Sequence, residues 1–64
     1  EAVTRGNKDD YKFSVCHFKE NRLMAVECIN DQKTFMQAKK LIEAGGMITP
    51  EAAKDYKTNL KDWL

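Results

Sequence analysis

A chain of 64 residues with a formal net charge of +1 is long enough for one small domain. A domain of this size buries only about 60% of the surface that its unfolded chain exposes, so its hydrophobic core must be thin. The eleven basic and ten acidic residues are interspersed along the chain. This pattern excludes the concentrated basic face with which proteins bind the phosphate backbone of nucleic acids.

The cysteines and the histidine form no metal-binding pattern. A structural zinc site needs four ligands, usually in two close pairs, whereas this chain offers only Cys16, His17 and Cys28. No apolar run approaches the roughly 20 residues of a membrane span, and residues 1–5 lack the plan of a signal peptide. We therefore expect a cytoplasmic protein without a metal site or a membrane contact.

The first half of the chain has the pattern of a β-hairpin. Two segments rich in Phe, Val, Tyr and Ile, 11–18 and 23–29, flank a polar stretch with Glu20 and Asn21 at its centre. A two-residue turn there pairs Phe18 with Leu23, and further along it pairs Cys16 with Ala25, Val15 with Val26 and Phe13 with Cys28. Residues 1–5 are a candidate third strand.

This register divides the hairpin residues between two faces of the sheet. The face that we expect in the core carries Phe13, Val15, His17, Met24, Val26 and Cys28. The opposite face is half apolar, and its Phe18 and Leu23 at the hairpin tip would be exposed in an isolated domain. We interpret that second face as one that another domain covers. Because the register separates Cys16 from Cys28, we also expect no disulfide between them.

The second half of the chain predicts helices. Asn30 and Asp31 are good N-cap residues, and the apolar residues that follow recur at intervals of three and four up to Gly45–Gly46: Phe35, Ala38, Leu41 and Ile42. Thr49–Pro50 begins a short second helix, and Leu60, Trp63 and Leu64 share one face of a last turn. The predicted fold class is α+β: an antiparallel β-hairpin or three-stranded sheet covered by one long helix and one or two short helices.

The order and spacing of these fragments resemble the C-terminal domain of FAD-dependent, NAD(P)H-using ferredoxin reductases of the putidaredoxin reductase type. The matching runs are Phe13-Ser14-Val15, Arg22-Leu23, Ala25-Val26, Ile29-Asn30, Phe35 and Leu41-Ile42, with Arg5-Gly6-Asn7 before them and Asn59-Leu60-Lys61 after them. The sequence departs from the family pattern at Glu20-Asn21, where the family has Asp-Gly, and at Cys16, where an aromatic residue is usual. We therefore expect residues 1–64 to be one reductase C-terminal domain, a fragment of a larger flavoprotein.

The resemblance implies a domain that packs on the flavin domain of its own parent chain and shapes the surface for a ferredoxin or rubredoxin. In this family, FAD accepts hydride from NAD(P)H and passes electrons on singly. The flavin-contacting residues of the family lie before the position that Glu1 matches, and the chain has no Gly-x-Gly-x-x-Gly motif. We therefore expect no catalytic, cofactor-binding or metal-binding residue here, and no activity from this chain alone.

The candidate interface residues are Phe18, Leu23, Lys19, Arg22, Lys33 and Lys40. The basic members of this set can steer an acidic electron carrier by their field, although an ordinary solvated face has the same composition. Cys16 and His17 are adjacent, but neighbouring strand residues point to opposite faces, so they do not form a nucleophile–base pair. The alternative function is a free-standing protein-interaction module with the same hairpin-plus-helix pattern.

Overall fold

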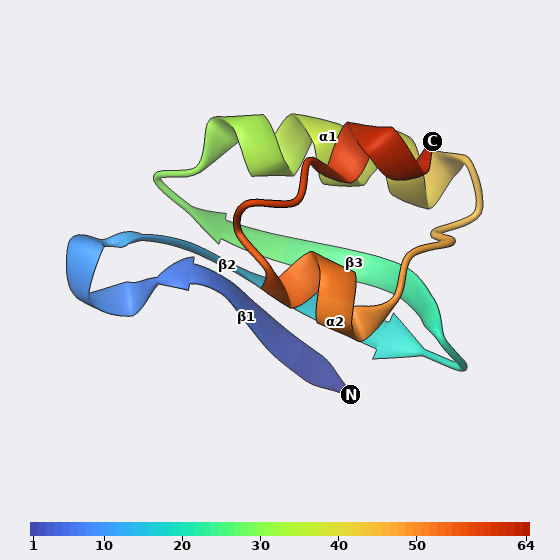
Figure 1. The fold of residues 1–64 in the computed structure, drawn as a ribbon, viewed down its shortest axis with the longest axis horizontal. Coiled ribbons are helices and arrows are strands. Elements are labelled where there is room, and N and C mark those ends of the chain that lie inside the picture. The colour runs from blue at the N-terminus through green and yellow to red at the C-terminus, as the bar shows by residue number, and fades with distance from the viewer.

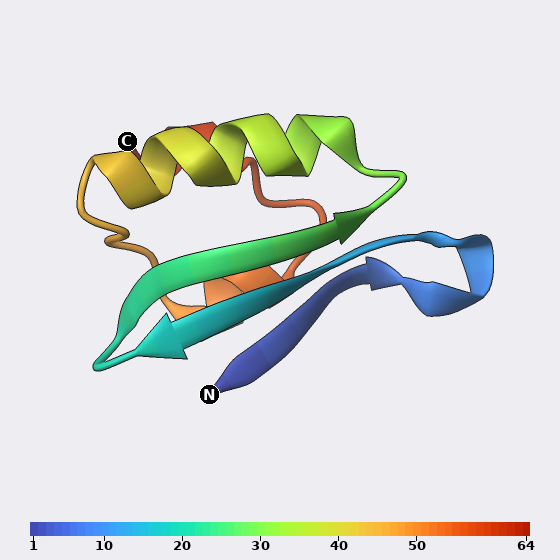
Figure 2. The same cartoon turned by 180° about the vertical axis from the view of Figure 1, so that it is seen from behind.

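A computed structural model describes residues 1–64 and shows three antiparallel strands with helices packed against one face (Figures 1 and 2). The strands are β1 (Ala2–Asn7), β2 (Lys12–Lys19) and β3 (Arg22–Ile29), and they form the sheet in that order. The helices are α1 (Gln32–Glu43) and α2 (Pro50–Lys54), with 3-10 turns at Lys8–Asp10 and Leu60–Trp63. The predicted α+β fold and its third strand are confirmed. None of the helices has the length and apolar character that a membrane crossing requires.

The predicted two-residue turn joins β2 to β3. Glu20 and Asn21 both have a positive φ, at 54° and 63°, as a type I′ hairpin turn requires. Next to the turn, Phe18 pairs with Leu23 as predicted. The turn therefore fixes the pairing of Phe18 with Leu23, the two residues that enter the core at the hairpin tip.

A β-bulge shifts the register beyond the tip. Met24 has no partner in β2, because Phe18 pairs with Leu23 while His17 pairs with Ala25. The extra residue moves every later pair by one position. The predicted pairs of Cys16 with Ala25, Val15 with Val26 and Phe13 with Cys28 are therefore wrong: the observed partners are Val26, Glu27 and Ile29, respectively.

The bulge also corrects the predicted faces of the sheet. Because it puts Leu23 and Val26 on one face, the β2 residues that point toward the helices are the buried Ser14, Cys16 and Phe18. The β2 residues predicted for the core lie on the opposite face instead: Phe13, Val15 and His17. The Met24 side chain, also predicted for the core, is 54% exposed.

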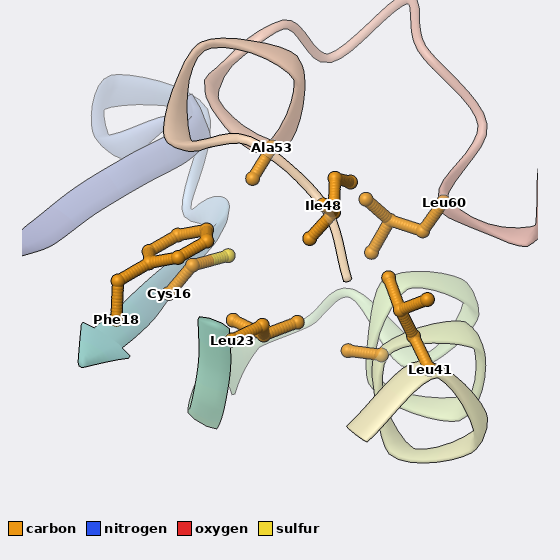
Figure 3. Close-up of a cluster of buried hydrophobic side chains, with 8 residues drawn as sticks. Cys16, Phe18, Leu23, Leu41, Ile48, Ala53 and Leu60 are labelled. Atoms are coloured by element: carbon orange, nitrogen blue, oxygen red, sulfur yellow. The ribbon is translucent and has the colours of Figure 1, made fainter. Parts of the chain in front are cut away.

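The hydrophobic core lies between the sheet and the helices (Figure 3). Its buried members are Cys16, Phe18, Leu23, Ala38, Leu41, Ile48, Ala53 and Leu60. The predicted apolar stripe of α1 is confirmed at Ala38 and Leu41, but Phe35 is 46% exposed and Thr34 is buried. In the last turn Leu60 alone enters the core, and Trp63 and Leu64 remain exposed.

Both ends of α1 are closed by specific hydrogen bonds. The side chain of Asp31 accepts a hydrogen bond from the backbone N–H of Thr34, which confirms Asp31 as the N-cap. At the other end, the N–H groups of Gly45 and Gly46 donate to the carbonyl oxygens of Ile42 and Leu41, the pattern of a Schellman motif. The Gly46 carbonyl in turn accepts from the N–H of Leu23 at 2.9 Å. A Cβ atom on Gly46 would lie 2.3 Å from the Leu23 carbonyl oxygen, so only glycine permits this contact between α1 and the hairpin.

Candidate docking surfaces

Two of the predicted interface residues belong to the domain's own core. Phe18 is 6% exposed and Leu23 is 1% exposed, and both lie in the cluster that contains Leu41 and Ile48. The face that we expected another domain to cover is therefore covered by the helices of this chain. The physical reason is the bulge at Met24, which turns the hairpin tip and its two apolar side chains toward α1.

Lys33 and Lys40 lie together on one groove at the surface of α1. The groove is lined by Lys33, Met36, Gln37 and Lys40 of α1 and by Lys61 and Leu64 of the C-terminal segment, and we call it the lysine groove. Helix positions at intervals of three and four share one face, and this face differs from the buried one that carries Ala38 and Leu41.

The lysine groove combines positive charge with apolar surface. No acidic residue lines it, and none of its three ammonium groups takes part in an ion pair. Met36 and Leu64 are 53% and 60% exposed, and they provide the apolar surface between the charges. Sequence reasoning missed Lys61 as a member of this surface. Its position depends on the burial of Leu60, which fixes the last turn against α1.

Lys19 and Arg22 occupy a different place. They pair with each other across the hairpin turn and line a separate hollow with Glu20 and Met24. The structure therefore does not combine the four basic candidates into one surface: Lys33 and Lys40 share the lysine groove, while the hairpin tip lies apart from it.

Arg5 is the most extensively hydrogen-bonded side chain of the domain, and sequence reasoning gave it no role. Its side chain is 4% exposed, and Nε donates to Thr34 Oγ1 at 3.4 Å. Nη1 donates to the carbonyl oxygens of Ala53 (3.2 Å) and Asp55 (2.8 Å), and Nη2 donates to that of Thr58 (2.6 Å). Arg5 therefore fastens β1 to α1 and to the segment that leads to the C-terminus.

Cys16 and His17 point to opposite faces of the sheet, as predicted. Cys16 is fully buried, whereas the His17 side chain lies on the uncovered face with Nε2 2.6 Å from Glu27 Oε1. Burial raises the pKa of the Cys16 thiol, and the Arg5 guanidinium opposes this rise, while Cys28 and Asp31 add to it. A thiol that remains protonated is a poor nucleophile, so the arrangement gives no catalytic pair.

The raised pKa of Cys16 predicts a loss of stability at alkaline pH. Below the ordinary thiol pKa of 9.0 the stabilisation is complete, and it is lost as the pH rises toward the higher pKa of the folded state. We expect the free energy of unfolding to fall less steeply between about pH 8 and about pH 10 in Cys16→Ala than in the unsubstituted chain. Urea melts at both pH values measure this difference. Cys28→Ala is the matched control and should keep most of the fall, because burial is the largest cause of the raised pKa of Cys16. Parallel pH profiles for all three chains would contradict the prediction.

Cys16 and Cys28 form no disulfide, but they do not lie on opposite faces of the sheet as predicted. Cys16 pairs with Val26 and Ser14 pairs with Cys28, so both cysteines lie on the core face, in diagonal positions. Cα atoms of diagonal neighbours in a sheet are about 7–8 Å apart, which exceeds the span of a disulfide. Both thiols are free, and the Ser14 hydroxyl donates a hydrogen bond to Cys28 Sγ at 3.1 Å.

The residues of this chain do not fit a dinucleotide cofactor or a metal ion. A dinucleotide site needs a glycine-rich turn between a strand and the N-terminus of a helix. Gly6 lies in β1, and Gly45 and Gly46 follow the C-terminus of α1, so no such turn exists. No group of three or more His, Cys, Asp or Glu side chains lies close enough together to hold a metal.

Comparison with known proteins places these features in one family. A family described as Reductase C-terminal matches residues 1–64. The chain is 37% identical over 59 residues to rhodocoxin reductase of Rhodococcus erythropolis, an alignment that covers 92% of this chain and 14% of that protein. It is 32% identical over 50 residues to a ferredoxin–NAD(P)(+) reductase of a Sphingomonas species, covering 78% of this chain and 12% of that protein.

A solved structure has the same fold. The crystal structure of the ferredoxin reductase for the CYP199A2 system from Rhodopseudomonas palustris matches with a TM-score of 0.89 at 27% identity, over 98% of this chain and 16% of that one. The chain thus spans only 12% to 16% of the length of these three relatives.

Proposed function

Because the chain belongs to the family of reductase C-terminal domains, we propose that it completes an FAD-dependent NAD(P)H:ferredoxin or rubredoxin reductase without supplying a catalytic group. In this proposal the domain packs on the flavin domain of its parent chain, and its lysine groove forms part of the surface that receives the electron carrier. The observation that carries the proposal is the family match over all 64 residues. The relatives described above are all reductases, which favours this function over a free-standing interaction module.

The lysine groove suits a transient, acidic partner. Lys33, Lys40 and Lys61 are exposed ammonium groups without ion-pair partners, so their combined field extends into solvent over about one Debye length, roughly 8–10 Å at physiological salt. Such a field speeds the encounter with an acidic protein and orients it before contact. FAD bound in the parent would accept hydride and release single electrons, while these side chains would hold the carrier at the surface.

Charge reversal in the lysine groove tests this role in the parent reductase. We expect Lys33→Glu, Lys40→Glu and Lys61→Glu together to raise the KM for the carrier by about tenfold or more at low salt, because rim charges control the association rate. NAD(P)H-dependent reduction of ferricyanide, a small acceptor that needs no docking surface, should be unchanged. The difference in carrier KM should shrink as the ionic strength rises.

A matched control removes the effect of net charge. Lys12→Glu, Lys54→Glu and Lys57→Glu change the net charge by the same amount at exposed positions outside the groove. If both triple variants raise the carrier KM equally, then only the overall charge matters and the lysine groove is not the docking surface. If ferricyanide reduction falls as well, the substituted groove affects the flavin domain instead of the carrier.

A further inference from the structure

No helix covers one face of the sheet. In the view of Figure 2 the three strands lie in front, α2 lies behind them and α1 lies above. The register places nine residues on this open face in three rows across the strands: Ala2, His17 and Ala25; Thr4, Val15 and Glu27; Gly6, Phe13 and Ile29. We call this surface the open face. The helices α1 and α2 and the last 3-10 turn pack on the other side, and only Lys8 of the first 3-10 turn reaches over the edge of the open face, at Phe13.

The open face is largely apolar, and its one carboxylate belongs to Glu27. β1 contributes only the small residues Ala2, Thr4 and Gly6, whereas Phe13, Val15 and Ile29 supply the larger apolar side chains. Ile29 is 47% exposed. This surface has two titratable groups, the imidazole of His17 and the carboxylate of Glu27. They contact each other, with His17 Nε2 2.6 Å from Glu27 Oε1. Basic groups lie only at its edges: Lys8 Nζ is 6.0 Å from the centre of the Phe13 ring, and Lys19 pairs with Arg22 at the hairpin end of the strands.

These properties differ from those of the lysine groove and indicate a permanent partner. Contacts that form and break with a diffusing partner gain from unpaired charge, while permanent contacts are larger and more apolar. The one carboxylate of the open face contacts His17, and the sheet and α1 separate this face from the groove. A reductase could therefore hold this domain by the open face and still leave the groove free for a carrier.

We propose that the open face is the surface by which this domain packs on the flavin domain of its parent chain. This inference rests on the proposed function, and it identifies the contact surface that the function requires. The occupant follows from chain length: the domain spans only 12% to 16% of its reductase relatives, so most of each relative lies outside it. The domain's own helices already cover the other face of the sheet, which leaves the open face for that larger part.

Cysteine footprinting of the intact parent reductase tests the inference. Ala25→Cys puts a thiol at an exposed position of the open face, and Met36→Cys puts one in the lysine groove. Each variant is treated with N-ethylmaleimide in the native state and in denaturant, and the labelled peptide is quantified by mass spectrometry. We expect labelling in the native state to be about tenfold or more slower at position 25 than at position 36, and equal at both in denaturant, because burial restricts reagent access to transient openings.

The outcomes separate this inference from the proposed function. Fast labelling at both positions would overturn the inference and leave the lysine groove available for a carrier. Fast labelling at position 25 with slow labelling at position 36 would overturn both, because the flavin domain would then cover the helical side. Slow labelling at both positions would support the open face as the contact and contradict the groove as a free docking site. Glu27→Cys, a second open-face variant, should repeat the result at position 25 if burial and not a local distortion is the cause.

Discussion

Replacing Arg5 with methionine is expected to lower the free energy of unfolding by about 3–5 kcal/mol, because the backbone carbonyl oxygens that accept from its guanidinium would lose their donor. The guanidinium donates to Thr34 and to the carbonyl oxygens of Ala53, Asp55 and Thr58. Methionine has a similar length but no donor. A chain of this size has roughly 3–10 kcal/mol of stability in total, so this loss is a large part of it.

The loss should begin in the C-terminal segment. The Arg5 guanidinium also lies 5.1 Å from the centre of the Tyr56 ring, so the Arg5→Met variant would lose both the hydrogen bonds and the contact that order this segment. Urea melts followed by circular dichroism give the stability, and hydrogen exchange of the amides of residues 53–58 locates the change. Arg22→Met, at an exposed arginine of the hairpin tip, is the matched control and should cost less than about 0.5 kcal/mol. Equal losses in the two variants would show that the hydrogen bonds of Arg5 do not stabilise the fold.

Leu41→Ala is expected to cost about 2–5 kcal/mol, because Leu41 lies at the centre of the contact between α1 and the sheet. The side chain is 1% exposed and belongs to a core of only eight buried apolar residues. A core this thin has few neighbours that can move in to fill the cavity. The preceding residue of the helix, Lys40, is exposed, and Lys40→Ala should change stability by less than about 0.5 kcal/mol. Urea melts measure the loss of stability in both variants. Similar losses would mean that the face of α1 that carries Leu41 is not the face that packs on the sheet.

Local signals in the sequence predicted most of the elements. The turn at Glu20–Asn21, the N-caps Asp31 and Thr49 and the glycines after α1 each act through neighbouring residues, so a linear pattern reveals them. The bulge at Met24 left no such signal, because apolar and polar residues alternate in 23–29 equally well with the bulge and without it. This single extra residue reversed the assignment of β2 and moved Phe18 and Leu23 from the predicted interface into the core.

The buried polar residues could not be predicted from periodicity. Thr34 is buried in α1 in place of its predicted neighbour Phe35, and Arg5 of β1 donates a hydrogen bond to its hydroxyl. The two residues are 29 positions apart, and no periodic pattern connects them. The lysine groove shows the same division: the spacing of Lys33 and Lys40 on one helix was visible in the sequence, but the arrival of Lys61 beside them depends on tertiary packing.

The hydrogen bonds of Arg5 also bear on the order in which the chain folds. Those to the C-terminal segment join residues 48 to 53 positions apart in a chain of 64, so nearly the whole polypeptide forms the loop that they close. The entropy lost on closing a loop increases with its length, and contacts of long sequence separation slow folding. The β2–β3 hairpin and α1 need only nearby residues to form, whereas the hydrogen bonds that hold residues 53–58 cannot form until β1 has joined the sheet. We therefore expect residues 53–58 to be the last part of the domain to acquire native contacts during folding.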